Sequence, residues 1–147
     1  MPRLHLLSPA LAILVAACTT QPPTEAPREP RTIAPFTIAV QGDNRGEIGP
    51  CGCTLRQEGG LPRRATVLAK AREAGPILLL DSGDALFPKL GKGGDRDDEK
   101  AALILREMAG MGTAAMAVGE RDLALGADWL VSQAKEAGLP LLCANLR

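Results

Sequence analysis

The chain has 147 residues, enough for one domain of ordinary size, and its 17 lysines and arginines balance its 17 aspartates and glutamates. This balance and an aromatic content of 2% argue against a nucleic-acid partner, because such a surface needs positive charge and several stacking rings. The sequence has one histidine, His5, which lies in a segment that we expect maturation to remove. A mature chain without it offers no histidine for a nucleophilic triad or a metal site.

The N-terminus has the features of a secretory signal peptide over residues 1–17, with Arg3 followed by an apolar run at residues 11–17. This run is too short to span a bilayer, which takes roughly 20 apolar residues. The sequence Val-Ala-Ala-Cys that ends at Cys18 resembles a bacterial lipobox, in which the cysteine is acylated after cleavage. We therefore expect attachment to membrane lipid through Cys18, in a bacterial cell envelope on the periplasmic or surface side. The alternative is an ordinary signal peptide with a coincidental cysteine.

Residues 18–31 are expected to form a lipid-anchored linker, because four prolines and no apolar cluster cannot build a core. The folded domain is then expected over residues 32–147. There, apolar patterns predict strands at 36–40, 77–80, 113–118 and 139–143 and helices at 61–74, 97–111 and 127–137.

This alternation predicts an α/β domain with a parallel sheet of about four strands and helices on its faces. The uninterrupted apolar run at 77–80 is typical of a strand that is covered on both faces. The last predicted strand, 139–143, is expected to lie at an open edge of the sheet.

Polar residues directly follow the predicted strands, where parallel sheets bind ligands. Asp43, Asp84 and either Glu120 or Asp122 would converge at one edge of the sheet. Several carboxylates in one cleft repel each other unless a cation neutralises them, and oxygen ligands suit Mg²⁺, Mn²⁺ or Ca²⁺. The alternative is that these acids form turns and helix caps.

Within residues 36–146, several segments resemble the N-terminal part of the 5′-nucleotidase and UDP-sugar hydrolase branch of the calcineurin-like metallophosphoesterases. The segments are GDNRG, GGLPRRATVLAKAREAG, ILLLDSGDALF, MGTAAMAVGERDLALGADWL and GLPLLCANL. The resemblance implies the same fold and a two-metal site that binds a phosphate ester and activates a water molecule. It also implies histidine ligands from a later half of the domain, so we expect that a missing C-terminal half is required for activity.

The motifs of this family are matched only in part. Asp43 matches the aspartate of an Asp-x-His motif, but Arg45 stands in place of the histidine. Asp84 completes a Gly-Asp motif, whose aspartate bridges the two metals in the family. A Gly-Asn-His-Glu motif reads Gly-Glu-Arg-Asp here, so Glu120 replaces the metal-binding asparagine and Arg121 the phosphate-facing histidine.

These substitutions leave the chemistry of the site open. Asp43, Asp84 and Glu120 would hold a divalent metal (Mn²⁺, Mg²⁺ or Zn²⁺), with Arg45 on the phosphate and Arg121 in the catalytic position. The two arginines could bind a phosphate as fixed cations. They could also neutralise the acids directly, in an ion-pair cluster from which the metal has been lost.

Cys51 and Cys53 resemble the Cys-Gly-Cys motif of a subgroup of nucleotidase-like lipoproteins, some of which carry selenocysteine. A structural disulfide, a redox-active pair and a Zn²⁺ or Cu⁺ site with Cys143 are the alternatives. Cys143 by itself is expected to be a small buried apolar residue.

Three functions follow as hypotheses. The first is a membrane-anchored, 5′-nucleotidase-like metallophosphoesterase with a degenerate site, acting on a small phosphorylated substrate such as a nucleotide. The second is a lipoprotein for thiol redox chemistry or soft-metal handling through Cys51 and Cys53. The third is a non-catalytic binding module of the cell envelope.

Overall fold

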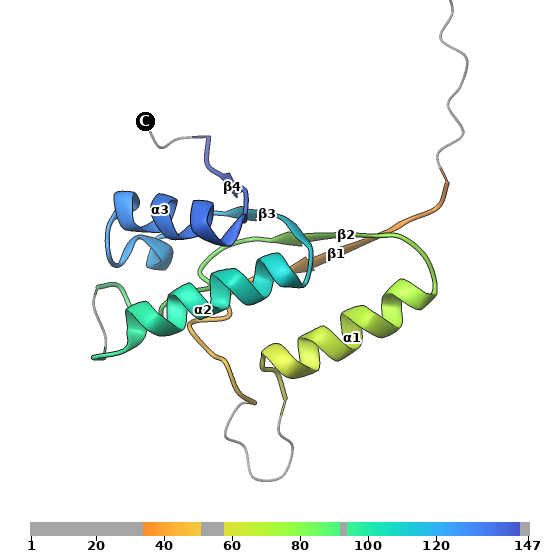
Figure 1. Ribbon diagram of the computed structural model, residues 1–147, viewed down its shortest axis with the longest axis horizontal. Helices are drawn as coiled ribbons and strands as arrows, with labels where there is room; N and C mark the ends of the chain where they lie inside the picture. The colour runs from red at the N-terminus through yellow and green to blue at the C-terminus, as the bar shows by residue number, and fades with distance from the viewer. Residues whose placement is uncertain (1–33, 51–57, 92–93, 145–147) are drawn as a thin grey trace, which may run out of the picture. The chain divides into compact units, whose positions relative to one another are not determined.

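The computed structural model describes residues 34–50, 58–91 and 94–144. This part of the chain contains a four-stranded parallel sheet and three α-helices that alternate with the strands (Figure 1). The elements are β1 (Thr37–Gln41), α1 (Leu61–Glu73), β2 (Ile77–Asp81), α2 (Asp97–Gly110), β3 (Thr113–Ala117), a short 3₁₀ helix η1 (Arg121–Leu123), α3 (Ala127–Ala137) and β4 (Leu141–Leu142). The predicted α/β fold with a parallel sheet of about four strands is confirmed.

Some sequence predictions concern parts of the chain that lie outside these described residues. They are the signal peptide at 1–17, the acylated Cys18, the linker at 18–31 and the Cys51–Cys53 pair. Among the helices that are described, none has both the length and the apolar character that a membrane span requires.

Local sequence explains where the helices begin and end. A proline occupies the first turn of α1, where its missing N–H group costs nothing. Three acidic residues occupy the first turn of α2, where they interact favourably with the positive end of the helix dipole. α3 ends at Gly138, which adopts the left-handed conformation at φ 74°.

The order of the strands in the sheet follows their order in the chain, β1-β2-β3-β4. β1 and β2 pair in unbroken register, so Gln41 lies beside Asp81 where both strands end. The pairing of β2 with β3 shifts by one residue between Leu79 and Leu80. Within the described chain, β4 pairs with β3 alone and forms an open edge, as predicted.

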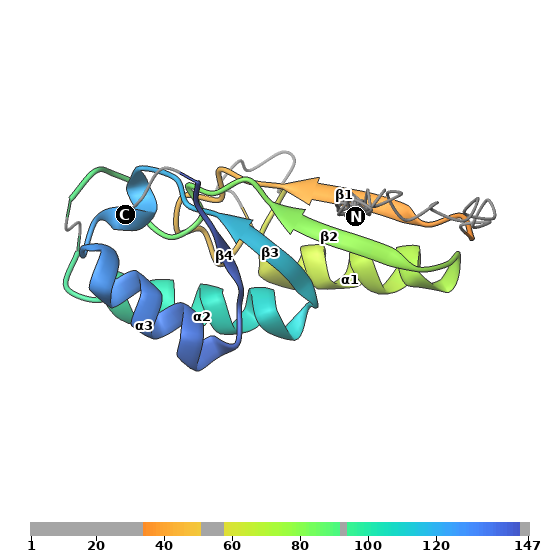
Figure 2. The same cartoon turned by 90° about the horizontal axis from the view of Figure 1, so that it is seen from above.

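All three described α-helices lie against the same face of the sheet, as Figure 2 shows. With strands in chain order, every right-handed crossover steps in the same direction, so every helix falls on the same side. On the other face Val40 and Leu78 are exposed. The prediction that strand 77–80 is covered on both faces is therefore wrong for the described chain. An apolar run shows what a strand can bury, whereas the topology decides which neighbours are present.

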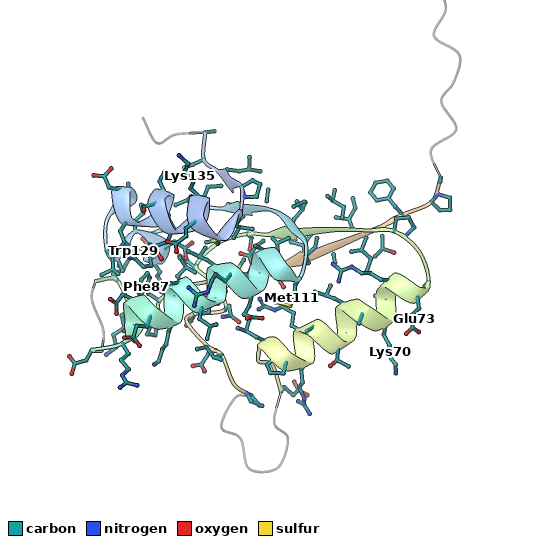
Figure 3. The ribbon with its side chains drawn as sticks, viewed as in Figure 1. Lys70, Glu73, Phe87, Met111, Trp129 and Lys135 are labelled. Carbon is teal, nitrogen blue, oxygen red and sulfur yellow. The ribbon has the colours of Figure 1, made fainter. Side chains whose placement is uncertain are left out.

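The core lies between the sheet and the helices. Leu79 and Met116 project into it from β2 and β3 and pack against buried residues of α2 and α3. Phe87, in the segment after β2, packs against Trp129 of α3 with ring centroids 5.8 Å apart (Figure 3). This aromatic pair holds the segment after β2 against α3.

Candidate functional site

Three turns meet at the carboxyl ends of β1, β2 and β3. The turn after β1 runs beside the turn after β2, because the Asp43 N–H donates to the carbonyl of Gly83 at 2.9 Å. Two residues further on, the Arg45 N–H donates to the carbonyl of Asp84 at 3.0 Å. These main-chain bonds extend the β1–β2 pairing beyond the strands and bring both turns to one rim of the sheet.

Three residues of this rim adopt a backbone conformation that is uncommon for side chains other than glycine. Asp43, Arg45 and Asp84 have φ values of 54°, 50° and 53°. A left-handed residue reverses the local direction of the chain and is tolerated by aspartate better than by most residues. The main chain, rather than packing of the side chains, therefore sets the direction in which these three side chains leave the rim.

The turn after β3 approaches the turn after β2 so closely that a glycine is required. A Cβ atom at Gly119 would lie 2.5 Å from the backbone nitrogen of Asp84 and would overlap its carboxylate. This contact explains why the third turn begins with glycine, and it places the residues after Gly119 next to Asp84.

Asp43 and Arg45 form a bidentate ion pair at the outer edge of the rim. Arg45 donates from Nε to Asp43 Oδ1 at 2.7 Å and from Nη2 to Oδ2 at 2.9 Å. Both side chains are about half exposed, at 57% for Asp43 and 51% for Arg45. The Arg45 guanidinium lowers the pKa of Asp43 from its ordinary value, and Arg121 adds to this effect.

Arg121 connects the two aspartates of the rim. Its backbone N–H donates to Asp84 Oδ1 at 3.0 Å, and its Nη1 lies 3.2 Å from Asp84 Oδ2. The same Nη1 lies 3.6 Å from Asp43 Oδ1. Two carboxylates and two guanidinium groups thus form one neutral chain of ion pairs, Arg45–Asp43–Arg121–Asp84.

Asp122 is fully buried beneath this chain of ion pairs and binds only main-chain groups. Its Oδ1 accepts hydrogen bonds from the N–H groups of Ala85 and Leu86, at 2.9 and 3.0 Å. Its Oδ2 accepts from Asp84 and Gly119, at 2.8 and 3.0 Å. Burial raises the pKa of Asp122, and the four N–H donors act in the opposite direction. Asp122 therefore ties the turns after β2 and β3 together as a structural residue.

A second buried carboxylate, Asp81, ends β2. Its Oδ1 accepts a hydrogen bond from the Gly83 N–H at 2.8 Å and so shapes the start of the turn. Burial raises the pKa of Asp81, whereas the Gly83 N–H and the charge of Arg64 act to lower it. Arg64 also donates to Asn44 Oδ1 at 2.8 Å, which attaches α1 to the turn after β1.

A cavity of about 470 Å³ opens between β1 and α1, below the rim. Its wall is mainly apolar, and its polar end is formed by Gln41, Asn44, Arg63 and Arg64. The Arg64–Asn44 hydrogen bond at this end is a structural contact between α1 and the turn after β1.

The structure brings four of the predicted site residues together: Asp43, Arg45, Asp84 and Arg121. Glu120 is exposed, and the described residues contain no cluster of three or more acidic, cysteine or histidine side chains that could hold a metal ion. The donors as they stand do not fit a divalent cation, because the Arg45 guanidinium donates to both oxygens of Asp43, while Arg121 donates to one oxygen of Asp84 from its main chain and to the other from its guanidinium. The predicted divalent metal stays a prediction without a matching donor set among these residues.

Cys143 departs from its predicted environment. It is exposed at the end of β4, whereas we expected a small buried residue. The expectation came from the general tendency of free cysteine to be buried, but β4 ends at Leu142 and lies at the sheet edge.

The role of Asp122 was not evident from sequence, where it was an alternative to Glu120 as a metal ligand. Its position three residues after Gly119 is the available signal, since an aspartate often accepts from the main chain of its own turn. The bonds to Ala85 and Leu86 span 36–37 residues of sequence and leave no local pattern.

The architecture is similar to that of solved structures. The chain is similar to a 5′-nucleotidase precursor from Thermus thermophilus, with 25% sequence identity and a TM-score of 0.62 over 75% of this chain and 22% of that chain. It is also similar to a Staphylococcus aureus protein assigned as a 5′-nucleotidase and solved with alpha-ketoglutarate, with 20% identity and a TM-score of 0.55. The second match likewise covers 75% of this chain and 22% of that chain. No family model and no curated protein matches the sequence.

The described domain therefore has the fold of the N-terminal part of 5′-nucleotidase structures. The chain spans about a fifth of the length of the nucleotidases that it matches. The narrower resemblance to lipoproteins with a Cys-Gly-Cys motif stays a prediction.

Proposed function

We propose that this chain is a 5′-nucleotidase-like domain that binds a phosphate ester, such as a nucleotide, and has lost metal-dependent hydrolysis. The observation that supports the proposal is the neutral chain Arg45–Asp43–Arg121–Asp84 at the rim. It places two guanidinium groups at the positions of the two motif histidines of the family, and it leaves neither aspartate with uncompensated charge.

Arg45 is the group best placed to receive a phosphate. Its planar guanidinium is about half exposed and presents donors in a fork that matches two phosphate oxygens. Its present partner, Asp43, is equally exposed, so water can solvate the carboxylate when the arginine turns to a ligand. Exchange of one acceptor for another at this position therefore costs little free energy.

Arg121 would supply a second, more fixed positive charge. Its side chain is 24% exposed and is held by Asp84 through both its main chain and its guanidinium. A phosphate dianion between Arg45 and Arg121 would meet one mobile and one anchored cation. A divalent metal, in contrast, would have to displace arginine from both aspartates.

The cellular setting is part of the same proposal. We propose attachment of the mature chain to membrane lipid through Cys18, with residues 18–31 as a spacer. A C-terminal half, like the remaining length of the matched nucleotidases, is proposed as the partner that would complete the domain. Thiol chemistry at Cys51 and Cys53 stays a prediction, because both residues lie outside the part of the chain that the structure describes.

Calorimetric titration of the full chain with a nucleoside monophosphate, in EDTA, tests the proposal. We expect binding that requires the phosphate, so the matching nucleoside should not bind. Arg45→Gln should weaken binding by about tenfold or more, because a charge-assisted bidentate contact is lost. Arg106→Gln, which removes an exposed arginine on α2, is the matched control and should bind as the unmodified chain does.

A hydrolysis assay with p-nitrophenyl phosphate and added Mn²⁺ completes the test, and no turnover is expected. Turnover that EDTA abolishes would replace the binding proposal with a metal-dependent hydrolase. Binding of the nucleoside as tightly as the nucleotide would also contradict it. The triple variant Arg45→His, Glu120→Asn, Arg121→His restores three motif residues of the family, and acquired Mn²⁺ binding there would show that the residues now at these three positions exclude the metal.

A further inference from the structure

Arg45, the group proposed to receive a phosphate, is held by a carboxylate of its own chain. Asp43 lies two residues earlier and accepts from Arg45 Nε at 2.7 Å and from Nη2 at 2.9 Å. A guanidinium binds a pair of phosphate oxygens through the same kind of fork. A phosphate that approaches this edge of Arg45 must therefore displace Asp43.

Asp43 also lies between the two positive charges of the rim. Its Oδ1, which accepts from Arg45 Nε, is 3.6 Å from Arg121 Nη1. That distance is too long for a hydrogen bond, so the Asp43 carboxylate meets Arg121 through charge alone. The position where the two guanidinium groups attract an anion most strongly is therefore the position that Asp43 fills.

The main chain holds Asp43 and Arg45 ready to pair. Both residues have a left-handed backbone, with φ values of 54° and 50°, and both N–H groups are bonded to the neighbouring turn. The pair thus forms within a turn that is already ordered, and only side-chain freedom is lost. A carboxylate tethered in this way acts at a high effective concentration, with which a free anion must compete.

We propose that Asp43 is an internal competitor for the phosphate position and so regulates which anions the rim retains. This inference rests on the proposed function, because it concerns the same site. The apparent affinity for any anion is reduced in proportion to the fraction of chains in which Asp43 leaves Arg45 free. An anion with one charge and two oxygens, such as acetate, gains no contact that Asp43 does not already provide. A phosphate dianion brings a further charge and a further oxygen toward Arg121, so it can displace Asp43.

Calorimetric titration of the full chain with adenosine 5′-monophosphate, in EDTA, measures the competition. Asp43→Gly removes the competing carboxylate and suits a residue at φ 54°, so the turn should be kept. Its affinity should be about three- to tenfold higher than that of the unmodified chain, since exposed ion pairs are weak. Asp43→Asn should show a gain in the same direction and serves as a second variant.

Glu47→Gln is the matched control, because it removes an exposed negative charge from the same turn and leaves the Asp43–Arg45 pair in place. It should change the affinity by less than about twofold, since salt screens charges that are exposed and not in contact with the ligand. An equal gain in Glu47→Gln and Asp43→Gly would mean that general repulsion limits binding, and it overturns the inference.

Two further readouts report on Arg45 itself. Sodium acetate should weaken nucleotide binding by Asp43→Gly more than sodium chloride of equal ionic strength does, because acetate takes the place of the lost carboxylate. In the unmodified chain the two salts should act alike. Phenylglyoxal, which modifies guanidinium groups, should label Arg45 several times faster in Asp43→Gly than in the unmodified chain, as measured by mass spectrometry of peptides.

Failure of this inference differs from failure of the proposed function. Nucleotide binding that is equally tight in the unmodified chain and in Asp43→Gly overturns the inference alone, since the phosphate then uses another edge of Arg45. Equal labelling of Arg45 in the two chains also overturns it. Absence of nucleotide binding by both chains overturns the proposed function and, with it, the inference.

Discussion

The rim of the sheet has an inner and an outer part that are held in different ways. The inner part is formed by the turns after β2 and β3, which Asp122 joins through four main-chain hydrogen bonds in a fully buried position. The outer part is the turn after β1, where Asp43 and Arg45 pair in contact with solvent. The inner turns therefore determine the shape of the site, whereas the outer turn provides side chains that can exchange partners. Substitutions in the inner part should therefore destabilise the fold more than a substitution in the outer part.

Asp122→Ala should have the largest effect. It leaves four N–H groups without an acceptor, two of them buried and two part-buried, so the free energy of unfolding should fall by about 3–5 kcal/mol. Urea denaturation measures the change, with Asp128→Ala, an exposed aspartate at the start of α3, as the control. A loss below about 1 kcal/mol would show that Asp122 does not hold the inner turns.

Gly119→Ala should be the next most severe. The added methyl group would meet the backbone nitrogen of Asp84 at 2.5 Å, so the two inner turns must separate, at a cost of about 2–4 kcal/mol. Gly110→Ala, at the end of α2, has nothing within 4 Å of the added atom and should leave stability unchanged or slightly raised. Equal effects of the two substitutions in urea denaturation would contradict the close approach.

Asp81→Asn should change how the free energy of unfolding depends on pH more than it changes the value of that free energy at a given pH. Burial raises the pKa of Asp81 in the folded state, so the folded chain binds more protons than the unfolded chain above pH 3.8. Stability from this group is therefore greatest at low pH and is lost as pH rises through the folded pKa. Asparagine removes this contribution, so the urea midpoint should decrease less between pH 4 and pH 7 than it does in the unmodified chain. Part of the decrease should remain, because Asp122 contributes a change of the same sign. An unchanged slope would mean that Asp81 does not titrate as its burial requires.

Arg45→Gln should have the smallest effect on stability, because it breaks an exposed ion pair that water can replace. Its urea midpoint at pH 7 should match that of the unmodified chain, even though ligand binding is weakened. The ion pair of the unmodified chain should also disappear as pH falls below 3.8 through the lowered pKa of Asp43. A marked loss of stability in Arg45→Gln would remove the distinction between the outer turn and the inner turns.

Sequence patterns predicted the order and type of every described α-helix and strand, because each element buries an apolar stripe that its own residues define. The helix predicted at 127–137 has those bounds in the structure, and the other elements differ by three residues or fewer. The meeting of Asp43 with Arg121 also follows from placing polar residues at the carboxyl ends of parallel strands. The uncovered face and the buried role of Asp122 did not follow, since both depend on contacts between segments far apart in the chain.

The left-handed backbone at Asp43, Arg45 and Asp84 has a consequence for how this site can change. Main-chain bonds between neighbouring turns fix those bends, so they persist whichever side chain is attached. The backbone of the rim can therefore carry different side chains: a histidine, a carboxylate or a guanidinium can occupy these positions without refolding the domain. Single substitutions at such positions can add or remove a catalytic or binding activity while the fold stays the same.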